Sequence, residues 1–217
     1  RGKNFSRTSL SDWNAYFYYN AIDPTYIVTP EGKHFLIYGS WHSGFALLEV
    51  DPNTGKPLNN LGEPYADNAE DLKTRYGKRI GTRTDGSRWQ GSEAPEIIYK
   101  DGYYYLFLAY DALDIPYNTR VVRSTNIEGP YLDITGRNFT NGRGDTYPIV
   151  THPYRFNLSH GWVGISHCAV FQKENSNEWF YMSQGRLPAN VGGNNYSNAI
   201  MMGHVRRIVW TPASKSE

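Results

Sequence analysis

The sequence predicts an all-β fold built from repeated antiparallel sheets, and three observations favour it. Aromatic residues form 15% of the 217-residue chain, with 18 tyrosines among them. Such side chains suit half-buried strands. One pattern of strand, turn and strand occurs three times along the chain. A helical period of apolar residues appears only weakly, at 68–76, so helices are not expected to contribute much.

Each copy of the pattern predicts a β-hairpin that opens on a polar residue. An apolar run follows, then a turn and an aromatic-rich run. The copies are Asp23–Ser40, Glu93–Tyr110 and His167–Gln184, with turns at Pro30-Glu31-Gly32, Lys100-Asp101-Gly102 and Glu174-Asn175-Ser176-Asn177. These turn residues are typical of hairpins. In this alignment Ile27, Ile97 and Val170 are equivalent, at intervals of 70 and 73 residues.

A third strand is expected after each hairpin, over Phe45–Val50, Thr119–Ser124 and His204–Trp210. Repeated antiparallel meanders of this kind are typical of β-propeller blades. Three such repeats use the whole chain, whereas closed propellers have about 4 to 8 blades. We therefore expect either that blades are missing or that another chain completes the ring.

The opening polar residues of the repeats are candidates for a common site. In a propeller, the first strand of each blade lines the central channel. Asp23, Glu93 and His167 occupy the same place in their repeats, within one residue, and are therefore expected to meet at one mouth. The alternative is that each residue only satisfies backbone groups of a local turn.

Composition excludes several classes of function. Lys and Arg number 22 and Asp and Glu 21, so the net charge of +1 provides no electrostatic footprint for nucleic acid or anionic lipid. No run approaches the roughly 20 apolar residues of a membrane helix. Cys168 is the single cysteine, which excludes an internal disulfide and a thiolate metal cluster. Neither nucleic acid nor membrane is an expected partner.

The ordered motifs of residues 12–210 resemble the arabinanase branch of glycoside hydrolase family 43. They are Asn20-Ala21-Ile22-Asp23-Pro24 with Phe35–Trp41, Glu93–Leu106, Ser166–Phe171 and His204–Ile208. The resemblance implies a five-bladed β-propeller with about three to four blades in this chain, as a single incomplete catalytic domain over 1–217. It also implies inverting hydrolysis of α-1,5-linked L-arabinan or arabino-oligosaccharides, and a secreted or periplasmic location.

The resemblance assigns roles to individual residues. Glu93 matches the general acid, and Asp23 matches the aspartate that modulates pKa and orients substrate. His167 matches a histidine that helps to hold a hydrated calcium or similar ion at the axis. Ser40 resembles a residue of the arabinose-binding subsite. Asn20 and Trp41 are further candidates for binding substrate, with a core position as the alternative for Trp41.

The family's general base has no counterpart in this sequence. That base is an aspartate in a short motif on the first blade, and the one acidic residue before Asn20 is Asp12, whose surroundings do not match. We therefore expect that the chain lacks the first blade, and that an upstream segment or a partner subunit of a homo-oligomer supplies the base. Asp111 and Asp114 are weaker substitutes.

Inverting hydrolysis uses two carboxyl groups about 6.5–9.5 Å apart, and the acid must hold its proton near neutral pH. An ionised Asp23 across the channel would disfavour ionisation of Glu93. Glu96 competes for the acid role, but strand alternation predicts that it lies on the opposite face from Glu93.

Two other functions stay open at this level. The first alternative to arabinan hydrolysis is an inactive, carbohydrate-binding propeller, and the second is a xylosidase or arabinofuranosidase of the same family. The polar segment Asp67–Gln90 is either a solvated connector or a cleft wall, in which Arg83 or Trp89 contacts sugar.

Overall fold

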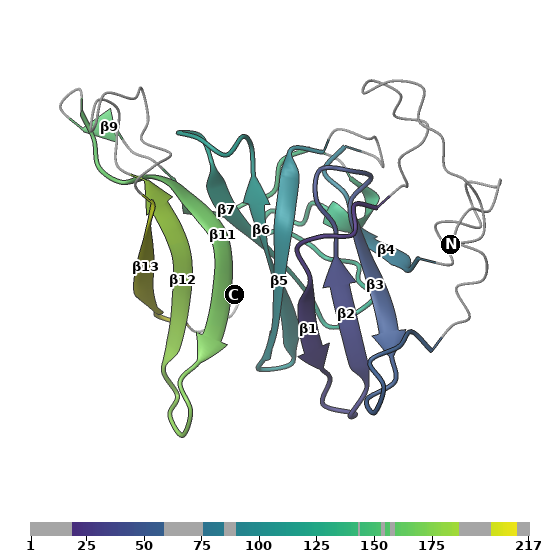
Figure 1. The fold of residues 1–217 in the computed structure, drawn as a ribbon. Helices are drawn as coiled ribbons and strands as arrows, with labels where there is room; N and C mark the ends of the chain where they lie inside the picture. Colours follow the sequence, from purple (N-terminus) through teal and green to yellow (C-terminus); the bar gives the residue numbers. More distant parts are fainter. Residues whose placement is uncertain are drawn as a thin grey trace, which may run out of the picture.

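The computed structural model describes residues 19–58, 76–84, 90–142, 144–152, 155–156, 159–186 and 201–211. Strands dominate these residues and form three sheets that lie side by side (Figure 1). Within the described ranges, helical structure is confined to the 3-10 turn η2 (Phe139–Asn141). None of the described residues lies in a helix that could span a membrane. The all-β prediction is confirmed, whereas the weak helical period at 68–76 lies outside the described residues except for Tyr76.

The first sheet, sheet 1, is a four-stranded antiparallel meander in the order β1-β2-β3-β4. Its strands are β1 (Thr25–Val28), β2 (His34–Tyr38), β3 (Phe45–Val50) and β4 (Lys78–Gly81). Ile27 pairs with Phe35, and Leu36 pairs with Leu48. The predicted first hairpin and third strand are therefore confirmed.

Sheet 2 repeats the arrangement in the order β5-β6-β7-β8. Its strands are β5 (Ser92–Lys100), β6 (Tyr103–Tyr110), β7 (Asn118–Ser124) and β8 (Ile149–Thr151). Lys100 pairs with Tyr103 across a two-residue turn in which Asp101 and Gly102 both have positive φ, at 49° and 84°. That backbone is typical of the turn favoured by an Asp-Gly pair.

Sheet 3 has the order β11-β12-β13, and a separate two-stranded ribbon precedes it. The sheet contains β11 (Val163–Gln172), β12 (Trp179–Arg186) and β13 (Met201–Ile208), and the ribbon contains β9 (Arg155–Phe156) and β10 (Ser159–His160). The third strand thus begins and ends earlier than the predicted His204–Trp210. Pairing with β12, whose Trp179 stands opposite Ile208, determines where it ends.

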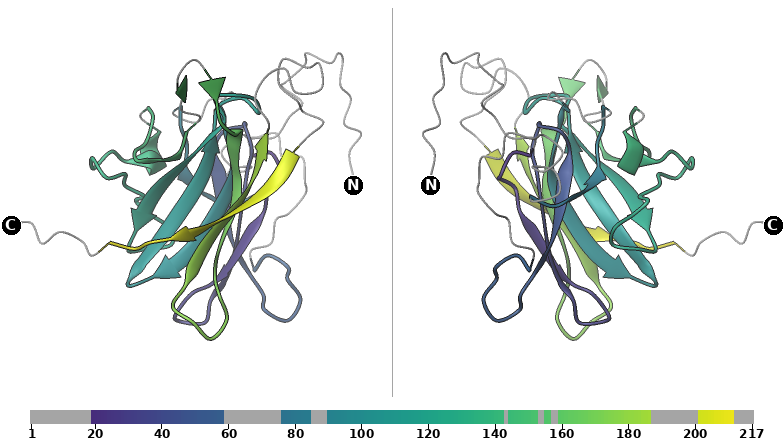
Figure 2. Two further views of the ribbon diagram at one scale, coloured as in Figure 1. Left: turned by 90° about the vertical axis from the view of Figure 1, so that its left-hand side faces the viewer. Right: turned by 90° about the vertical axis from the view of Figure 1, so that its right-hand side faces the viewer.

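The first strands β1, β5 and β11 are neighbours, with β5 between the other two (Figure 1). The hairpin turns that follow these strands all lie at one end of the molecule, the lower end in Figures 1 and 2. Three blade-like sheets are therefore present, and over the described residues they do not close into a ring. The propeller prediction is confirmed at this level.

Two fourth strands, β4 and β8, were not predicted. β4 lies inside the segment that the sequence left as a connector or cleft wall, and it contains only four residues, two of them basic. β8 has three residues, none of them buried. Strands this short have no readable alternation, so only pairing with β3 and β7 reveals them.

Two apolar cores join the three sheets, because adjacent residues of β5 face opposite neighbours. Ile97 packs into the core between sheets 1 and 2, which also contains Ile27, Ile37, Phe45, Leu47, Leu106, Leu108 and Tyr110. Ile98 packs into the core between sheets 2 and 3, with Phe107, Cys168, Val170 and Tyr181.

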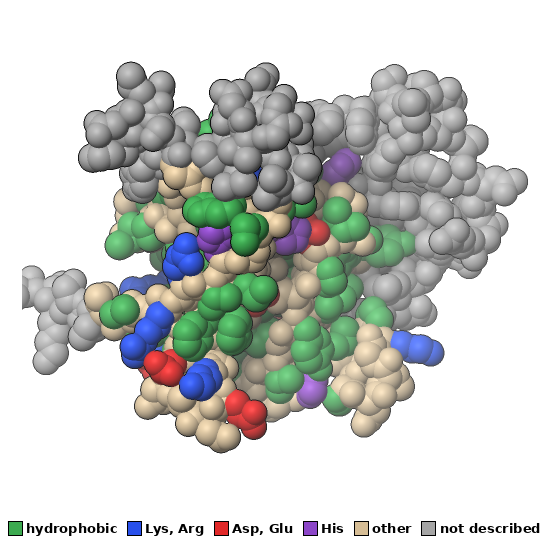
Figure 3. Space-filling view, turned by 60° about the vertical axis from the view of Figure 1, so that its left-hand side comes forward, with side chains coloured by type: hydrophobic (Ala, Val, Ile, Leu, Met, Phe, Trp, Pro, Cys, Tyr) green, Lys and Arg blue, Asp and Glu red, His purple; other side chains and the backbone are tan. Residues whose placement is uncertain are grey.

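Apolar side chains also gather on the surface shown in Figure 3. Exposed Phe171, Met182 and Val205 of sheet 3 are among the large apolar residues at the surface.

The structural alignment of the three repeats differs by one residue, at some positions, from the alignment predicted from the sequence. Asp23, Ala94 and His167 all have left-handed backbones, with φ of 55°, 49° and 54°, and each stands two residues before a regularly paired residue. These marks are 71 and 73 residues apart. Ile97 and Val170 are therefore equivalent as predicted, but Ile27 corresponds to Ile98. Glu93 stands one residue before its repeat's left-handed position.

Leu106→Ala tests the core between sheets 1 and 2. Leu106 is 0% exposed on β6, so truncation should lower the free energy of unfolding by about 2–5 kcal/mol. Urea denaturation measures this loss. Ile134→Ala is the control, because Ile134 is 77% exposed and its truncation should change stability by less than about 0.5 kcal/mol. Equal effects of the two substitutions would contradict the placement of this core.

Candidate active site

The left-handed residues bring three ionisable side chains together where the first strands meet. Asp23 lies just before β1, Glu93 is the second residue of β5, and His167 lies in the first half of β11. The Nε2 atom of His167 is 3.9 Å from Asp23 Oδ1. The backbone amide of Ala94, next to Glu93, donates to Asp23 Oδ2 at 3.2 Å. The predicted meeting of these residues is thus observed, whereas their catalytic roles stay predictions.

Glu93 is held by two hydroxyl groups, one on each carboxyl oxygen. Ser40, which is 2% exposed, donates from Oγ to Glu93 Oε2 at 3.1 Å. The hydroxyl of Tyr117 donates to Glu93 Oε1. Ser40 comes from sheet 1 and Tyr117 from the β6–β7 connection, so two separate parts of the chain orient one carboxyl group. Neither donor carries a charge.

Tyr117 is the functional residue that sequence reasoning missed. It is fully buried, and its hydroxyl also lies 3.4 Å from His167 Nδ1, so it links the acid candidate to the histidine. Burial first, and then the negative charge of Glu93, raise the pKa of Tyr117, which keeps the phenol protonated. The comparison of the repeats could not have found Tyr117, because this residue lies outside the repeated hairpins. No other signal in the sequence marks it among the 18 tyrosines.

The environment of Asp23 favours its protonated form. Burial raises the pKa of Asp23, and repulsion from Glu93 adds to the rise. The charge of His167 and the hydrogen bond from the Ala94 amide act in the opposite direction. Asp23 and Glu93 therefore interact electrostatically, and the role of Asp23 as a modulator of the acid stays a prediction.

Asn20 and Trp41 lie close to the site along the chain. Both are half-buried. The Asn20 carbonyl accepts a hydrogen bond from the Ile22 amide at 2.9 Å. Trp41 has φ of 60°, and its amide donates to the Ser92 carbonyl at 2.9 Å, directly before Glu93. Their binding of substrate stays a prediction.

Glu96 has partners different from those of Glu93, but the regular alternation expected between the two residues is interrupted. The pairing of β5 with β6 shifts between these residues, because Glu93 faces Ala109 and Glu96 faces Phe107, so three steps on one strand match two on the other. This bulge interrupts the alternation. Glu96 instead ties the first strands together, because its carboxyl oxygens accept from Thr25 Oγ1 at 2.9 Å and from the Val170 amide at 3.0 Å. Burial raises its pKa.

The substitute bases are placed differently from each other. Both carboxyl oxygens of Asp111 have partners, Arg83 Nη1 at 2.8 Å and Asn118 Nδ2 at 2.8 Å, which leaves this residue poorly suited to activate water. Oδ1 of Asp114 is buried and has no hydrogen-bond partner. Trp89, the other residue considered for sugar contact in that segment, lies outside the described residues.

The described residues do not fit a calcium site by themselves. They contain no group of three or more His, Cys, Asp and Glu side chains arranged to hold a metal ion. Calcium prefers about 6–8 oxygen ligands, whereas His167 offers one half-exposed imidazole. The ion that the resemblance implies stays a prediction.

A groove of about 420 Å³ lies elsewhere, towards the hairpin turns of the first strands. Its lining includes Val28, Pro30, Tyr99 and Gln172. The carboxyl groups precede or begin those strands, so the groove and the carboxyl cluster lie towards different ends of the sheets. The chemistry is therefore assigned to the cluster and not to the groove.

Comparison with known proteins agrees with this arrangement. Residues 8–212 match the model of "Glycosyl hydrolases family 43". An extracellular endo-α-(1→5)-L-arabinanase from Thermotoga petrophila is 33% identical over 186 residues, which cover 78% of this chain and 36% of the relative. Another from Bacillus subtilis is 32% identical over 178 residues, covering 78% and 33%. The chain thus spans about a third of the length of these curated relatives.

Solved structures show the same similarity. A family 43 glycoside hydrolase from Bacillus licheniformis matches with a TM-score of 0.70 and 27% identity, covering 89% of this chain and 42% of that one. The endo-1,5-α-L-arabinanase of Thermotoga petrophila matches with a TM-score of 0.68 and 28% identity, covering 88% and 40%.

Asp23→Asn tests the electrostatics of the cluster through stability. The pKa of Asp23 is raised above its ordinary value of 3.8 in the folded state, so the folded protein binds this proton more tightly than the unfolded chain. Protonated Asp23 therefore contributes favourably to the free energy of unfolding. This contribution is fully present below the ordinary pKa and is lost as pH rises through the pKa of the folded state. The substitution should therefore increase the free energy of unfolding near neutral pH, with a gain that shrinks in acid. Urea denaturation across the pH range measures it.

Asp133→Asn is a control of opposite sign. Burial by itself would raise the pKa of Asp133, but hydrogen bonds from Thr135, Arg137 and Tyr147 outweigh burial and lower this pKa. This substitution should destabilise the protein at neutral pH, and the loss should shrink in acid. A pH-independent effect of Asp23→Asn would contradict the electrostatic account of the cluster.

Proposed function

The chain belongs to glycosyl hydrolases family 43, and we propose that it hydrolyses α-1,5-linked L-arabinan or arabino-oligosaccharides. The observation that carries the proposal is the Glu93 carboxyl group, oriented by two neutral donors beside Asp23. The names of the relatives supply the substrate. Because the chain spans about a third of their length, the activity is proposed for the protein that contains this chain.

In the proposed reaction, Glu93 is the general acid of an inverting mechanism. It gives its proton to the glycosidic oxygen as the bond to the anomeric carbon breaks, while water attacks that carbon from the opposite face. Ser40 and Tyr117 orient the carboxyl group towards the leaving oxygen. Asp23 modulates how readily the acid releases its proton, because the two carboxyl groups repel each other when both are ionised.

The general base is proposed to lie outside this chain, in a further segment or a partner subunit. The carboxyl oxygens of Asp111 bind Arg83 and Asn118, which argues against this residue as a substitute base. No step is assigned to a metal ion, because His167 is a single ligand. Export from the cell is proposed as well, since both cited relatives are named extracellular.

The decisive test is release of reducing sugar from linear 1,5-linked arabinan by the full-length protein and its Glu93→Gln variant. Loss of the general acid should lower kcat by about 10²–10⁴-fold. Glu96→Gln is the matched control, because Glu96 is a carboxylate of the same strand that bonds only to Thr25 and Val170 among the described residues. It should retain most of the activity.

Three other outcomes would contradict the proposal. Activity that survives Glu93→Gln would show that Glu93 is not the general acid. Binding of arabino-oligosaccharides without hydrolysis by the wild type would favour the carbohydrate-binding alternative. Preference for xylo-oligosaccharides would favour the xylosidase alternative.

Tyr117→Phe should lower kcat with little change in KM. The substitution removes the hydroxyl that donates to Glu93 Oε1, and a hydrogen bond to a carboxylate contributes enough for a loss of about 10- to 100-fold. Steady-state kinetics on arabinan measure it. Tyr181→Phe is the control, because it removes another buried hydroxyl, which bonds to Thr119 Oγ1 at 2.7 Å, and should affect stability alone. Equal loss of kcat in both variants would overturn the role of Tyr117.

A further inference from the structure

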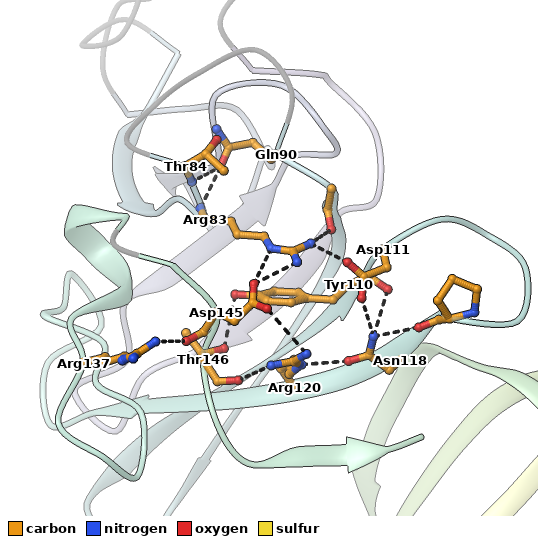
Figure 4. Close-up of polar contacts among 12 residues, drawn as sticks. Arg83, Thr84, Gln90, Tyr110, Asp111, Asn118, Arg120, Arg137, Asp145 and Thr146 are labelled. Carbon is orange, nitrogen blue, oxygen red and sulfur yellow. Dashed lines mark hydrogen bonds and ion pairs between the residues drawn. The ribbon is translucent and has the colours of Figure 1, made fainter. Parts of the chain in front are cut away.

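Arg83 lies just after β4, and protein groups enclose its guanidinium head (Figure 4). Nη1 donates to the Gly91 carbonyl at 2.7 Å and to Asp111 Oδ1 at 2.8 Å. Nε and Nη2 each lie 2.8 Å from Asp145 Oδ1. The side chain is only 16% exposed. These bonds commit Arg83 to protein partners, which argues against the sugar contact considered from the sequence.

The charge of Arg83 is balanced within its own cluster. The ring of Tyr110 lies between two guanidinium groups, with Arg83 at 4.4 Å and Arg120 at 5.0 Å from its centroid (Figure 4). Arg120 also lies 3.9 Å from Asp145 Oδ2. Two cations therefore face two carboxylates, Asp111 and Asp145. Burial alone would lower the pKa of Arg83, but the two carboxylates outweigh it, so the group stays charged.

Arg83 and Asp111 of this cluster bind the backbone two residues before Glu93. The Gly91 carbonyl accepts from Arg83 and also from the Asp111 amide, the latter at 2.8 Å. The next carbonyl, that of Ser92, accepts from the Trp41 amide at 2.9 Å. Gly91 has φ of 56°, and a Cβ there would stand 3.0 Å from Arg83 Nη1, so this approach is close.

These anchors matter because the strand ladder is irregular at this point. The pairing of β5 with β6 shifts between Glu93 and Glu96, so regular ladder pairing is interrupted immediately after Glu93. Before the shift, Ser92 and Glu93 still pair with Tyr110 and Ala109, so the bonds to Gly91 and Ser92 hold the end of this short paired stretch. Arg83 is a charged group whose side chain binds the backbone at the start of this stretch.

We propose that Arg83 is a positioning residue for Glu93: by binding the Gly91 carbonyl and Asp111 together, it determines how the chain enters β5 and so where the acid's carboxyl group lies. This inference rests on the proposed function, in which Glu93 is the general acid. Arg83 itself does not touch the reacting atoms. Misplacing a catalytic group by about 1 Å is enough to cost about 100-fold in rate.

The test compares two leaving groups in the full-length protein. Arabinotriose linked to phenol needs an acid to protonate the departing oxygen, whereas the dinitrophenyl analogue departs without one. Arg83→Gln should lower kcat about 100-fold on the phenyl substrate and much less on the dinitrophenyl substrate, with KM little changed. Glu93→Gln should show the same pattern. Arg83→Lys, which keeps the charge but not the planar fork, should restore part of the loss.

Arg137→Gln is the matched control. Arg137 also reaches this cluster, donating from Nη1 to the Asp145 carbonyl at 3.1 Å, and it is exposed. It should leave both rates unchanged. Thermal unfolding shows whether each variant folds. If Arg83→Gln does not fold, the rates of Arg83→Lys on the two substrates are compared instead.

The outcomes separate this inference from the proposed function. Equal losses on the two substrates, or no loss on either, would overturn the role of Arg83 while the proposed function stands. A wild type that cleaves neither substrate nor arabinan would overturn the proposed function, and the inference with it.

Discussion

The meeting of three first strands is the constraint on which the rest of the structure depends. β5 lies between β1 and β11, and its successive residues Ile97 and Ile98 enter two different apolar cores. This burial of both faces brings residues 71 and 73 positions apart into one cluster. The left-handed backbones at Asp23, Ala94 and His167 stand at corresponding places, the first just before β1 and the other two within β5 and β11. The site is thus a consequence of how blades pack, and not of any local motif.

Charge is distributed so that the acid candidate is oriented by neutral groups while cations act from a distance. Ser40 and Tyr117 hold the carboxyl oxygens of Glu93 without bringing a positive charge to them. A guanidinium group in their place would favour the ionised carboxylate, the wrong form for an acid. Arg83 instead acts on the backbone before Glu93, and two carboxylates balance it and Arg120. Orientation and charge are therefore supplied by separate groups.

Much of the fold could be predicted because its signals are local. Turn residues and apolar runs located the three hairpins and their third strands. The equivalent places of Asp23, Glu93 and His167 in their repeats predicted that these residues would meet. The short strands β4 and β8 carry no such signal. The bulge after Glu93 also escaped prediction, because alternation assumes a regular strand.

The sheet class, the repeat, the family and the residues proposed for acid chemistry could be read from the amino-acid sequence, since these depend on residue types at readable spacings. Only the tertiary structure decided which partners those residues meet. Tyr117 and Arg83 act across sequence separations of 24 and 8 residues, on the Glu93 carboxyl group and on the Gly91 carbonyl. Such contacts depend on how one connection packs over another strand. No sequence pattern records that geometry, because hydrogen bonds between distant segments form only once the sheets have been brought together.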